Sequence, residues 1–575
     1  MKVLRSHKWF YGPQETGQLH QGALRAVGID MDNYEGQPVI GIANTWSEFN
    51  NCNMSLRTIA EEVKKGVREA GGIPLEFPVI SLGEELMKPS AMLYRNLLSI
   101  EVEENIRSYP MDGVILLGNC DKTVPGLLMG AASADIPTIQ LNAGPKKVGV
   151  FNGVRLGSGT DLWKYWDEYR IGNITLKEWN EVGKALSCGF GSCNTMGTAS
   201  TMNGIVEALG MMPLGLSTLP VDDELRYALS RDAGRRIVSM VMEDLRPSDI
   251  MTLAAFRNAI AVCMALGGST NAIIHLTALA GRMNLSVYPE EFNSIGARIP
   301  CIADVQPIGK QLIDDFNNAG GIPGVIKQLA SALDLSVLTY TGKKLGEILD
   351  TEMQVDEGLI RPLDRPVTPA PTIAVLTGNV SPGGAVIKVS AAHPALLTHK
   401  ARAFVFEDYH EMLRLIDDED LAVDESTILI LKNAGAKGVP GMPEWGMIPI
   451  PRKLREKGVR DMVRLSDSRM SGTSFGTVVL HITPEAATGG IFALVETGDL
   501  ISLDVPNRKL ELLVDKKTLD ARRKKWLPVK PRFLRGYPSL YQKSILQADE
   551  GCDFDFLKPQ GDELPGLVEP VVGRS

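Results

Sequence analysis

The sequence predicts an α/β protein in which a domain with a largely parallel sheet is followed by a β-rich domain. A chain of 575 residues exceeds what one hydrophobic core usually serves, so two domains are expected. In the first part, apolar strand-like runs alternate with helical patterns, as is typical of a parallel sheet covered by helices. Four prolines within residues 361–371 interrupt any regular element and mark a linker. We therefore divide the chain into domains 1–365 and 366–575.

The first elements follow from the spacing of apolar residues. Residues 38–43 and 112–117 are short, almost continuous apolar runs, which predict buried strands. Between them, apolar residues recur at helical spacing from Leu56 to Val67. Ser55 stands where an N-cap is expected, and the glycines at 71 and 72 predict the end of this helix.

The most membrane-like window covers residues 261–281. Because a Gly-Gly-Ser-Thr-Asn run and His275 interrupt it, we interpret it as a buried helix pair or a loop followed by a helix, and expect no membrane contact. The N-terminal residues lack the apolar core of a signal peptide. We therefore expect a cytoplasmic protein with reduced thiols.

The second domain has a different sequence pattern. Short β-rich runs separated by Gly/Pro loops favour a barrel or a sandwich over another parallel sheet. These runs are residues 373–376, 385–389, 427–431 and 477–482. The tail after Trp526 is rich in aromatic residues, so we expect it to pack against the body of the protein or against another subunit.

Composition limits the classes of partner. The chain is 44% hydrophobic and 22% charged, which is ordinary for a soluble globular protein and excludes a disordered, collagenous or coiled-coil chain. With 69 acidic and 60 basic residues its net charge is −9, which argues against nucleic acid or an anionic membrane as the main partner. Seven cysteines are too few for a disulfide framework.

Three of the cysteines stand in loops suited to binding a ligand. They are Cys52, Cys120 and Cys193. Each loop follows a predicted strand or precedes a predicted helix, and ligands collect at the carboxyl ends of the strands in an open α/β sheet. The three thiolates can therefore meet at one soft metal centre, although the residue types fit three buried structural cysteines equally well. Cys263 and Cys301 are predicted to be inert core thiols, and Cys188 a bystander or a substitute ligand.

A second set consists of carboxylates in Gly/Pro loops. Its members are Glu84, Asp121 and Glu444. Oxygen ligands of this kind suit Mg²⁺ or another hard divalent ion. Each carboxylate taken alone is more typical of a solvated or capping side chain.

Taken together, these segments resemble the iron–sulfur dehydratases, the family of dihydroxy-acid, phosphogluconate and aldonate dehydratases. The matching segments are GNCDKT (118–123), SCNTMGTA (192–199), GGSTN (267–271), GNVSPGGAVIK (378–388), PGMPE (440–444), SRMSGT (468–473) and HITPEAA (481–487). They occur in the family's order from about residue 40 to 500. The resemblance implies an N-terminal αβα sandwich domain and a C-terminal β-barrel-like domain.

The resemblance also implies the cofactors. Cys52, Cys120 and Cys193 would hold an iron–sulfur cluster, with the two-iron form favoured and the four-iron form as the alternative. Three cysteines leave one iron open to act as a Lewis acid. Glu84, Asp121 and Glu444 would bind Mg²⁺, with Lys122 as a further ligand. An ammonium has no lone pair, so Lys122 can ligate only after a chemical change. In close relatives that change is carbamylation, which the resemblance implies here as well.

The implied reaction converts a 2,3-dihydroxy acid into a 2-keto-3-deoxy acid. Ser471, as an alkoxide, would take the proton from C2, and Thr473 would position the substrate or orient that serine. His275 and His481 are competing bases, although a core or loop histidine is the plainer interpretation of both.

Two substrate classes remain open. The run from Ser471 to Ser474 is similar to the sugar-acid branch of the family, whereas residues 378–388 and 441–444 are more similar to the branched-chain dihydroxy-acid enzymes. We favour a sugar acid, with dihydroxyisovalerate-type substrates or broad specificity as alternatives. An iron–sulfur redox or sensor protein and a lyase without iron are the other classes considered. The family's habit of forming dimers, or dimers of dimers, implies a homodimer or homotetramer.

Overall fold

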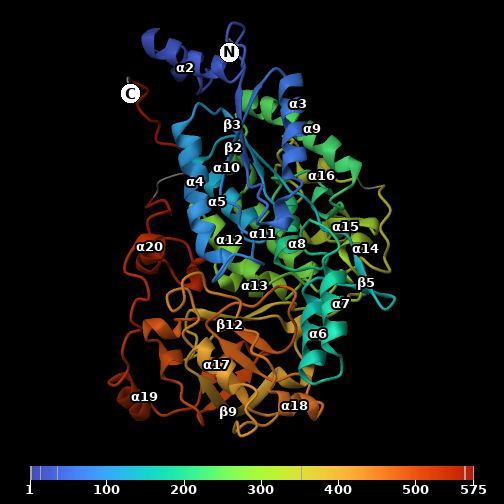
Figure 1. Cartoon of the computed structure of the whole chain (residues 1–575), viewed down its shortest axis with the longest axis vertical. Helices are drawn as coiled ribbons and strands as arrows, with labels where there is room; N and C mark the ends of the chain where they lie inside the picture. Colours follow the sequence, from blue (N-terminus) through green and yellow to red (C-terminus); the bar gives the residue numbers. More distant parts are fainter. Residues whose placement is uncertain (1–2, 13, 35, 351, 562–564, 574–575) are drawn as a thin grey trace.

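Two β-sheets organise the chain, one in each half (Figure 1). The computed structural model describes residues 3–12, 14–34, 36–350, 352–561 and 565–573. A four-stranded sheet lies in the upper half of Figure 1 and an eight-stranded, barrel-like sheet in the lower half. This arrangement confirms the predicted α/β class, with an αβα sandwich followed by a barrel-like part.

The first sheet is wholly parallel, with the strand order β2-β1-β3-β4. Its strands are β1 (Val39–Asn44), β2 (Ile73–Pro78), β3 (Gly113–Leu117) and β4 (Thr138–Leu141). The strands predicted at 38–43 and 112–117 are therefore correct to within one residue at each end. Every residue of β1, β3 and β4 is buried, which explains their continuous apolar runs.

Helices cover both faces of this sheet. Parallel crossovers are right-handed, so the connection from β1 out to β2 and the connections back through β3 to β4 lie on opposite faces. On one face α3 (Leu56–Glu69) packs beside α9 (Glu224–Glu243). On the other α4 (Arg95–Ser108) packs against α5 (Thr123–Ala134), and α12 (Asn271–Arg282) packs on α5 in turn. The result is the three-layer sandwich.

The start of α3 differs from the expectation in one detail. Ser55 stands at the N-cap position, but its backbone is already helical and its side chain caps nothing. A capping side chain requires an extended N-cap backbone to reach the free N–H groups. Here a 3₁₀ turn at Asn51–Asn53 leads into the helix, and Asn50 caps that turn through the Cys52 N–H. The helix ends at Glu69, before Gly71 with its φ of 79°, as predicted.

The apolar window at 261–281 is a helix pair. It contains the end of α11 (Leu253–Ala265) and most of α12, joined through a buried loop. None of the helices in the described ranges combines the length and the apolar character needed to cross a bilayer.

The second sheet has the order β14-β13-β9-β10-β11-β12-β8-β7. Its strands are β7 (Ala374–Leu376), β8 (Gly384–Ile387), β9 (Thr398–Phe406), β10 (Ile428–Leu431), β11 (Arg464–Ser466), β12 (Val478–Thr483), β13 (Leu500–Asp504) and β14 (Lys509–Leu512). A bridge between Thr377 and Lys509 joins its two edge strands, so the sheet nearly closes into a barrel. The predicted boundary at residues 365 and 366 precedes β7 and stays a prediction.

Part of this barrel is parallel, which the sequence analysis did not foresee. Strands β9, β10, β11 and β12 run in one direction. Their crossovers carry only short helices, α17 (Tyr409–Leu415) and α18 (Arg452–Glu456), and such connections resemble plain loops in the sequence.

The remaining elements lie around these two sheets. They are α1 (His7–Phe10), α2 (Gln14–Ala26), β5 (Gly149–Phe151), β6 (Val154–Leu156), α6 (Thr160–Arg170), α7 (Leu176–Leu186), α8 (Thr198–Ala208), α10 (Pro247–Ile250), α13 (Pro289–Gly296), α14 (Ile313–Asn318), α15 (Gly321–Gln328), α16 (Leu345–Ile348), α19 (Lys516–Arg523) and α20 (Gly536–Ser544).

The C-terminal tail packs on its own chain and contacts both halves. It ascends along the left of Figure 1 from α19 past α20. Tyr541 and Phe554 join a buried cluster with Leu93 from the first half and Met442 from the second. A fully buried ion pair, with Arg282 Nε 2.6 Å from Asp553 Oδ2, fixes the tail to α12.

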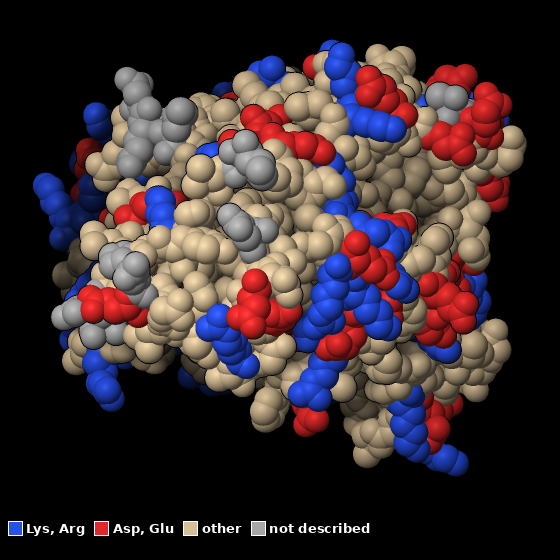
Figure 2. Space-filling view, turned by 90° about the horizontal axis from the view of Figure 1, so that it is seen from above, with Lys and Arg blue, Asp and Glu red and all other residues tan. Residues whose placement is uncertain are grey.

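Charges of both signs are interleaved on the face seen from above in Figure 2. Lys and Arg side chains lie among Asp and Glu, so no broad basic area covers this face. Ion pairs also join α9 to α3, since Arg231 and Arg235 both pair with Glu69.

Candidate active site

The carboxyl ends of the four parallel strands deliver most of the predicted site residues to one edge of the first sheet. Cys52 follows β1, Glu84 follows β2, and Cys120 follows β3. Beyond β4, the carbonyl of Gly144 accepts a hydrogen bond of 2.9 Å from the N–H of Ser192, the residue before Cys193. The strand order reverses between β1 and β3, which is the crevice where open α/β sheets bind their ligands.

The three predicted cysteines lie together. The interaction between the Cys52 and Cys120 thiols, together with burial, raises the pKa of Cys120 well above its ordinary value, and the Cys120 thiol donates to Asp121 Oδ1 at 3.5 Å. Cys193 interacts electrostatically with Cys120, and burial raises its pKa to about 12. A backbone hydrogen bond of 3.1 Å from Gly191 to Asn51 ties the Cys193 loop to the Cys52 loop. The structure thus brings three thiols from separate loops to one place.

Asn119 links these loops, and the sequence analysis assigned it no role. Its side-chain Nδ2 donates to the carbonyl of Cys52 at 2.9 Å and to that of Gly144 at 2.8 Å. Its Oδ1 accepts from the Gly144 N–H at 3.2 Å. Asn119 is fully buried, so this one amide fixes the loops after β1, β3 and β4 relative to each other. The signal available in the sequence was an asparagine directly before a candidate ligand cysteine.

The other cysteines named in the sequence lie elsewhere. The thiol of Cys188 donates to the carbonyl of Lys147 at 2.7 Å. Cys263 and Cys301 are fully buried, and burial raises the pKa of each thiol to about 12. The latter two are therefore core thiols, as predicted.

The predicted carboxylates surround Lys122. Its Nζ lies 2.5 Å from Asp121 Oδ2, 3.1 Å from Glu444 Oε1 and 3.5 Å from Glu84 Oε2. Burial and the neighbouring Arg469 lower the pKa of Lys122, but the three carboxylates outweigh them and raise it. Burial raises the pKa of Glu84, whose Oε2 has no hydrogen bond. Cys120 and Asp121 are adjacent, so the thiols and the carboxylates are neighbouring groups.

Two further side chains complete the carboxylate group. Arg469 donates to Glu444 Oε1 at 2.9 Å and to Ser90 Oγ at 2.9 Å. Burial raises the pKa of Glu444, but Lys122 and Arg469 outweigh it, so the net shift is downward. Asn271 donates to Glu444 Oε1 at 2.9 Å and to the carbonyl of Met470 at 3.2 Å. Both residues belong to quoted motifs, but the motifs did not reveal their contacts.

Ser471 and Thr473 share a loop between β11 and β12 that docks on the first half. Ser471 Oγ lies 2.9 Å from Thr473 Oγ1. Gly472 fits closely between the start of α8 and the loop before α12, because a Cβ there would lie 2.6 Å from the backbone N of Thr198 and 2.8 Å from Ser269 Cβ. Asn271, through Met470, connects this loop to the carboxylates.

The two histidines are poor candidates for the base. Burial, followed by the positive charges of Arg95, Lys122 and Arg469, lowers the pKa of His275 far below its ordinary value. Burial and Arg469 lower the pKa of His481 to about 3. Both rings are therefore neutral, weakly basic core side chains near pH 7.

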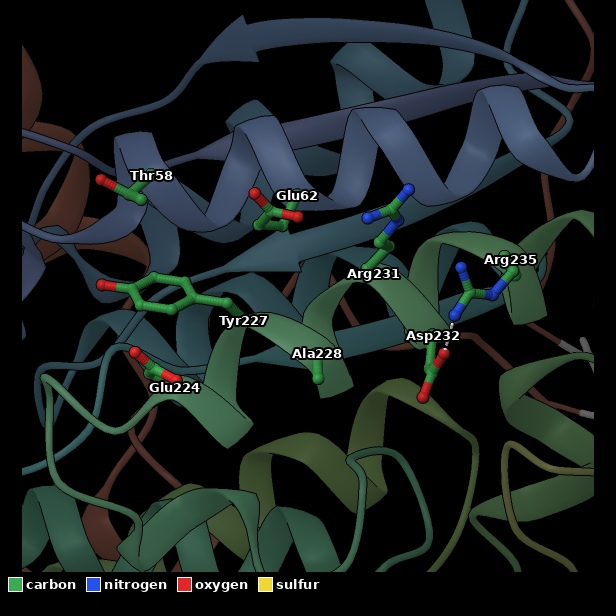
Figure 3. Close-up of a pocket in the computed structure, with 8 residues that line it drawn as sticks. All are labelled: Thr58, Glu62, Glu224, Tyr227, Ala228, Arg231, Asp232 and Arg235. Carbon is green, nitrogen blue, oxygen red and sulfur yellow. Dashed lines mark hydrogen bonds and ion pairs between the residues drawn. The ribbon is translucent and has the colours of Figure 1, made fainter.

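A surface hollow of about 620 Å³ lies elsewhere, between α3 and α9 (Figure 3). Tyr227, Glu62 and Glu224 line it together with charged residues that already have partners, such as Asp232 and Arg235. None of the predicted site residues lines this hollow.

The two groups of donors differ in chemistry. Thiolates prefer soft metals and iron–sulfur clusters, whereas carboxylates prefer hard cations such as Mg²⁺. Within the described ranges, no three Cys, His, Asp or Glu side chains already have the spacing of a bound metal ion. An ammonium stands among the carboxylates, and the Cys120 thiol donates a hydrogen bond to Asp121. The donor types suit both groups, and binding would require these contacts to rearrange.

Comparison with known proteins identifies similar chains along almost the whole length. Family models described as dihydroxy-acid/6-phosphogluconate dehydratase N-terminal and C-terminal match residues 37–348 and 358–552. An L-arabinonate dehydratase from Rhizobium leguminosarum is 48% identical, over 97% of this chain and 96% of its own. A 6-deoxy-6-sulfo-D-gluconate dehydratase from Pseudomonas putida is 46% identical, over 100% and 99%. A dihydroxy-acid dehydratase from Ignicoccus hospitalis is 37% identical, over 93% and 98%.

The role of Asn119 can be tested in the apo-protein. Asn119→Ala leaves the buried carbonyl of Cys52 without this donor and the buried N–H of Gly144 without its acceptor, at a cost of about 1–3 kcal/mol for each unsatisfied group. We expect a lower unfolding midpoint in urea, and alkylation of Cys52 and Cys120 at least about tenfold faster as the loops open. The half-buried Asn105→Ala, which removes one bond within α4, is the matched control. Unchanged alkylation in Asn119→Ala would contradict the role assigned to this amide.

Proposed function

Because the chain belongs to the dihydroxy-acid/6-phosphogluconate dehydratase family, we propose that it removes water from a 2,3-dihydroxy sugar acid and releases a 2-keto-3-deoxy acid. One structural observation supports this proposal most directly. Thiols, carboxylates and the Ser471 loop, which lie up to several hundred residues apart in the sequence, meet at one edge of the first sheet. Such a centre combines groups for binding a small hydroxylated anion with a group for moving its proton.

A sugar acid is favoured over a branched-chain acid. The two relatives at 46% and 48% identity are named for sugar acids, whereas the dihydroxy-acid dehydratase is 37% identical. The Thr473 hydroxyl, which lies beside Ser471 Oγ, supplies a polar group at a position where branched-chain enzymes typically carry glycine. A site built to hydrogen-bond hydroxyl groups discriminates strongly against an analogue that lacks them.

The proposed cofactors follow from the donors. Cys52, Cys120 and Cys193 would hold an iron–sulfur cluster, with the two-iron form favoured. Glu84, Asp121, Glu444 and a carbamylated Lys122 would hold Mg²⁺; carbamylation converts the ammonium into an anion that can replace its present ion pairs. When bound, these groups supply Lewis acidity for the departing C3 hydroxyl and for the charge that develops beside the carboxylate.

Ser471 is the proposed base. Its Oγ, once ionised, would take the proton from C2 while the C3–O bond breaks, and the hydroxide and one proton would leave as water. The enol that remains would then take up a proton at C3 and release the proton of its C2 hydroxyl, which gives the 2-keto acid. Thr473, 2.9 Å from Ser471 Oγ, would orient that oxygen through their shared hydrogen bond.

A branched-chain dihydroxy acid is the second candidate substrate. The segment GNVSPGGAVIK at 378–388 favours it, since it is similar to the corresponding segment of the dihydroxy-acid dehydratases. The 37% identity to such an enzyme over most of both chains adds support.

A substrate panel tests the proposal. We expect the anaerobically prepared enzyme to form 2-keto acids from aldonates with a kcat/KM at least about 10²-fold higher than from dihydroxyisovalerate. Glycerate, the shortest 2,3-dihydroxy acid, should react slowly because it lacks the remaining hydroxyl groups. A preference for dihydroxyisovalerate would replace the sugar-acid assignment with the branched-chain one, and no 2-keto product from any acid would reject the dehydratase.

The base assignment makes a separate prediction. Ser471→Ala should lower kcat by about 10²–10⁴-fold, because the group that takes the C2 proton is lost. Iron content, visible absorption and the melting temperature should match those of the unsubstituted enzyme. Ser426→Ala, which removes a hydroxyl from an exposed turn of the same half, serves as the control. Full turnover by Ser471→Ala would show that another group is the base.

A further inference from the structure

We propose that Lys388 is a positioning residue for the base: its ammonium holds the Gly472–Thr473 peptide so that the Thr473 N–H faces Ser471 Oγ. The inference rests on the proposed function, because it concerns how Ser471 is made basic enough to act. An ordinary serine hydroxyl is a very weak base, and the residues that favour its anion are therefore part of the site.

Lys388 is a buried cation directly after β8. The residue is 1% exposed, and its Nζ lies 3.4 Å from the carbonyl oxygen of Gly472. Within the described ranges, no carboxylate lies at ion-pair distance from this ammonium, and no other donor contacts the Gly472 carbonyl. A buried charge without a counter-ion is costly, and an anion that forms nearby during the reaction would compensate it.

One peptide group connects Lys388 to Ser471. The carbonyl of Gly472 and the N–H of Thr473 belong to the same peptide, and in a trans peptide these two groups point in opposite directions. On one side the carbonyl accepts from Lys388, and on the other the Thr473 N–H donates to Ser471 Oγ at 3.4 Å. A cation on the oxygen polarises the peptide and strengthens the N–H as a donor. The ammonium thus favours a negative charge on the serine oxygen.

The other contacts of this loop do not set the orientation of the Gly472–Thr473 peptide group, so Lys388 determines it. The close fit of Gly472 against Thr198 and Ser269 fixes its position, and the Thr160 hydroxyl holds the next carbonyl, that of Thr473, at 3.1 Å. Glycine places the weakest restriction on the rotation of its own peptide groups. Lys388 restricts this rotation from the barrel side.

The surroundings of Lys388 give the effect a pH dependence. The titratable groups that face it are the thiols of Cys263 and Cys301, whose pKa values burial raises to about 12, so both are neutral near pH 7. Burial lowers the pKa of Lys388 to about 8. Lys388 is therefore mostly protonated below pH 8 and mostly neutral above it. We expect kcat to fall as the pH rises through this range.

Three variants test the proposal: Lys388→Met, Lys388→Arg and the matched control Lys432→Met. Lys432 is also a buried lysine of the barrel half, but it pairs with Glu407 and lies outside the site. For each variant we would measure kcat and KM against pH on the best aldonate, and the kinetic isotope effect with deuterium at C2. Iron content and the melting temperature report on the cluster and the fold.

We expect Lys388→Met to lower kcat by about 10²-fold with little change in KM, as when one donor to a developing oxyanion is removed. Its isotope effect should rise, because proton removal becomes slower. Lys388→Arg should keep most of the activity and move the alkaline fall in kcat to higher pH, because arginine stays charged. Lys432→Met should lower the melting temperature without changing the isotope effect or the pH profile.

Two results would overturn the proposal. One is a Lys388→Met enzyme with an unchanged isotope effect and pH profile, and the other is an alkaline limb that stays in place in Lys388→Arg. The arginine variant keeps the cation, so it also decides the question if the methionine variant does not fold. Ser471→Ala in the same assays separates the two proposals. If it is inactive while Lys388→Met behaves like the unsubstituted enzyme, only the role of Lys388 fails, whereas an active Ser471→Ala would remove the proposed base itself.

Discussion

Four parallel strands that end at one edge of a sheet impose the geometry on which the rest of this molecule depends. Since every strand points the same way, the loops after β1, β2 and β3 emerge together and carry Cys52, Glu84 and Cys120 to neighbouring positions. The loop after β4 brings in Cys193 indirectly, through the bond between Gly144 and Ser192. The buried amide of Asn119 then joins these loops, so that three cysteines spread over 142 residues lie near one another.

The barrel half supplies the remaining side chains of the site. Glu444, Arg469 and Ser471 come from its loops, and each contacts residues of the first half or lies in a loop docked on it. Asn271 bonds both Glu444 and the Met470 carbonyl, and so relates the carboxylates to the base. The C-terminal tail packs against both halves and stabilises this arrangement through Arg282 and Asp553. The site therefore depends on the contact between the halves as much as on either half alone.

Sequence patterns predicted the elements that rest on local periodicity. The strands at 38–43 and 112–117, the helix ending before Gly71 and the barrel-like second half all have regular apolar signals. Contacts between distant residues have no such signal. The bonds of Asn119, Arg469 and Lys388 depend on how separate loops meet, and the helical backbone of Ser55 depends on the 3₁₀ turn before it. The runs at 427–431 and 477–482 did predict β10 and β12, but the parallel direction of β9 to β12 was missed because their crossovers are short.

The same distinction applies to the site. Residue types and loop positions picked out Cys52, Cys120 and Cys193 without favouring one shared site over three structural cysteines. Only the family resemblance singled out Ser471, since nothing local separates it from an ordinary turn serine. Its surroundings now supply a physical reason: Thr473 on one side and a peptide held by a buried ammonium on the other.

Anomalous scattering at the iron absorption edge, from crystals grown without oxygen, tests the central claim most directly. The convergence of the strand-end loops predicts an iron peak bonded to the sulfur atoms of Cys52, Cys120 and Cys193, next to the carboxylate of Asp121. Iron held by any other set of residues, or no iron peak in active crystals, would contradict it.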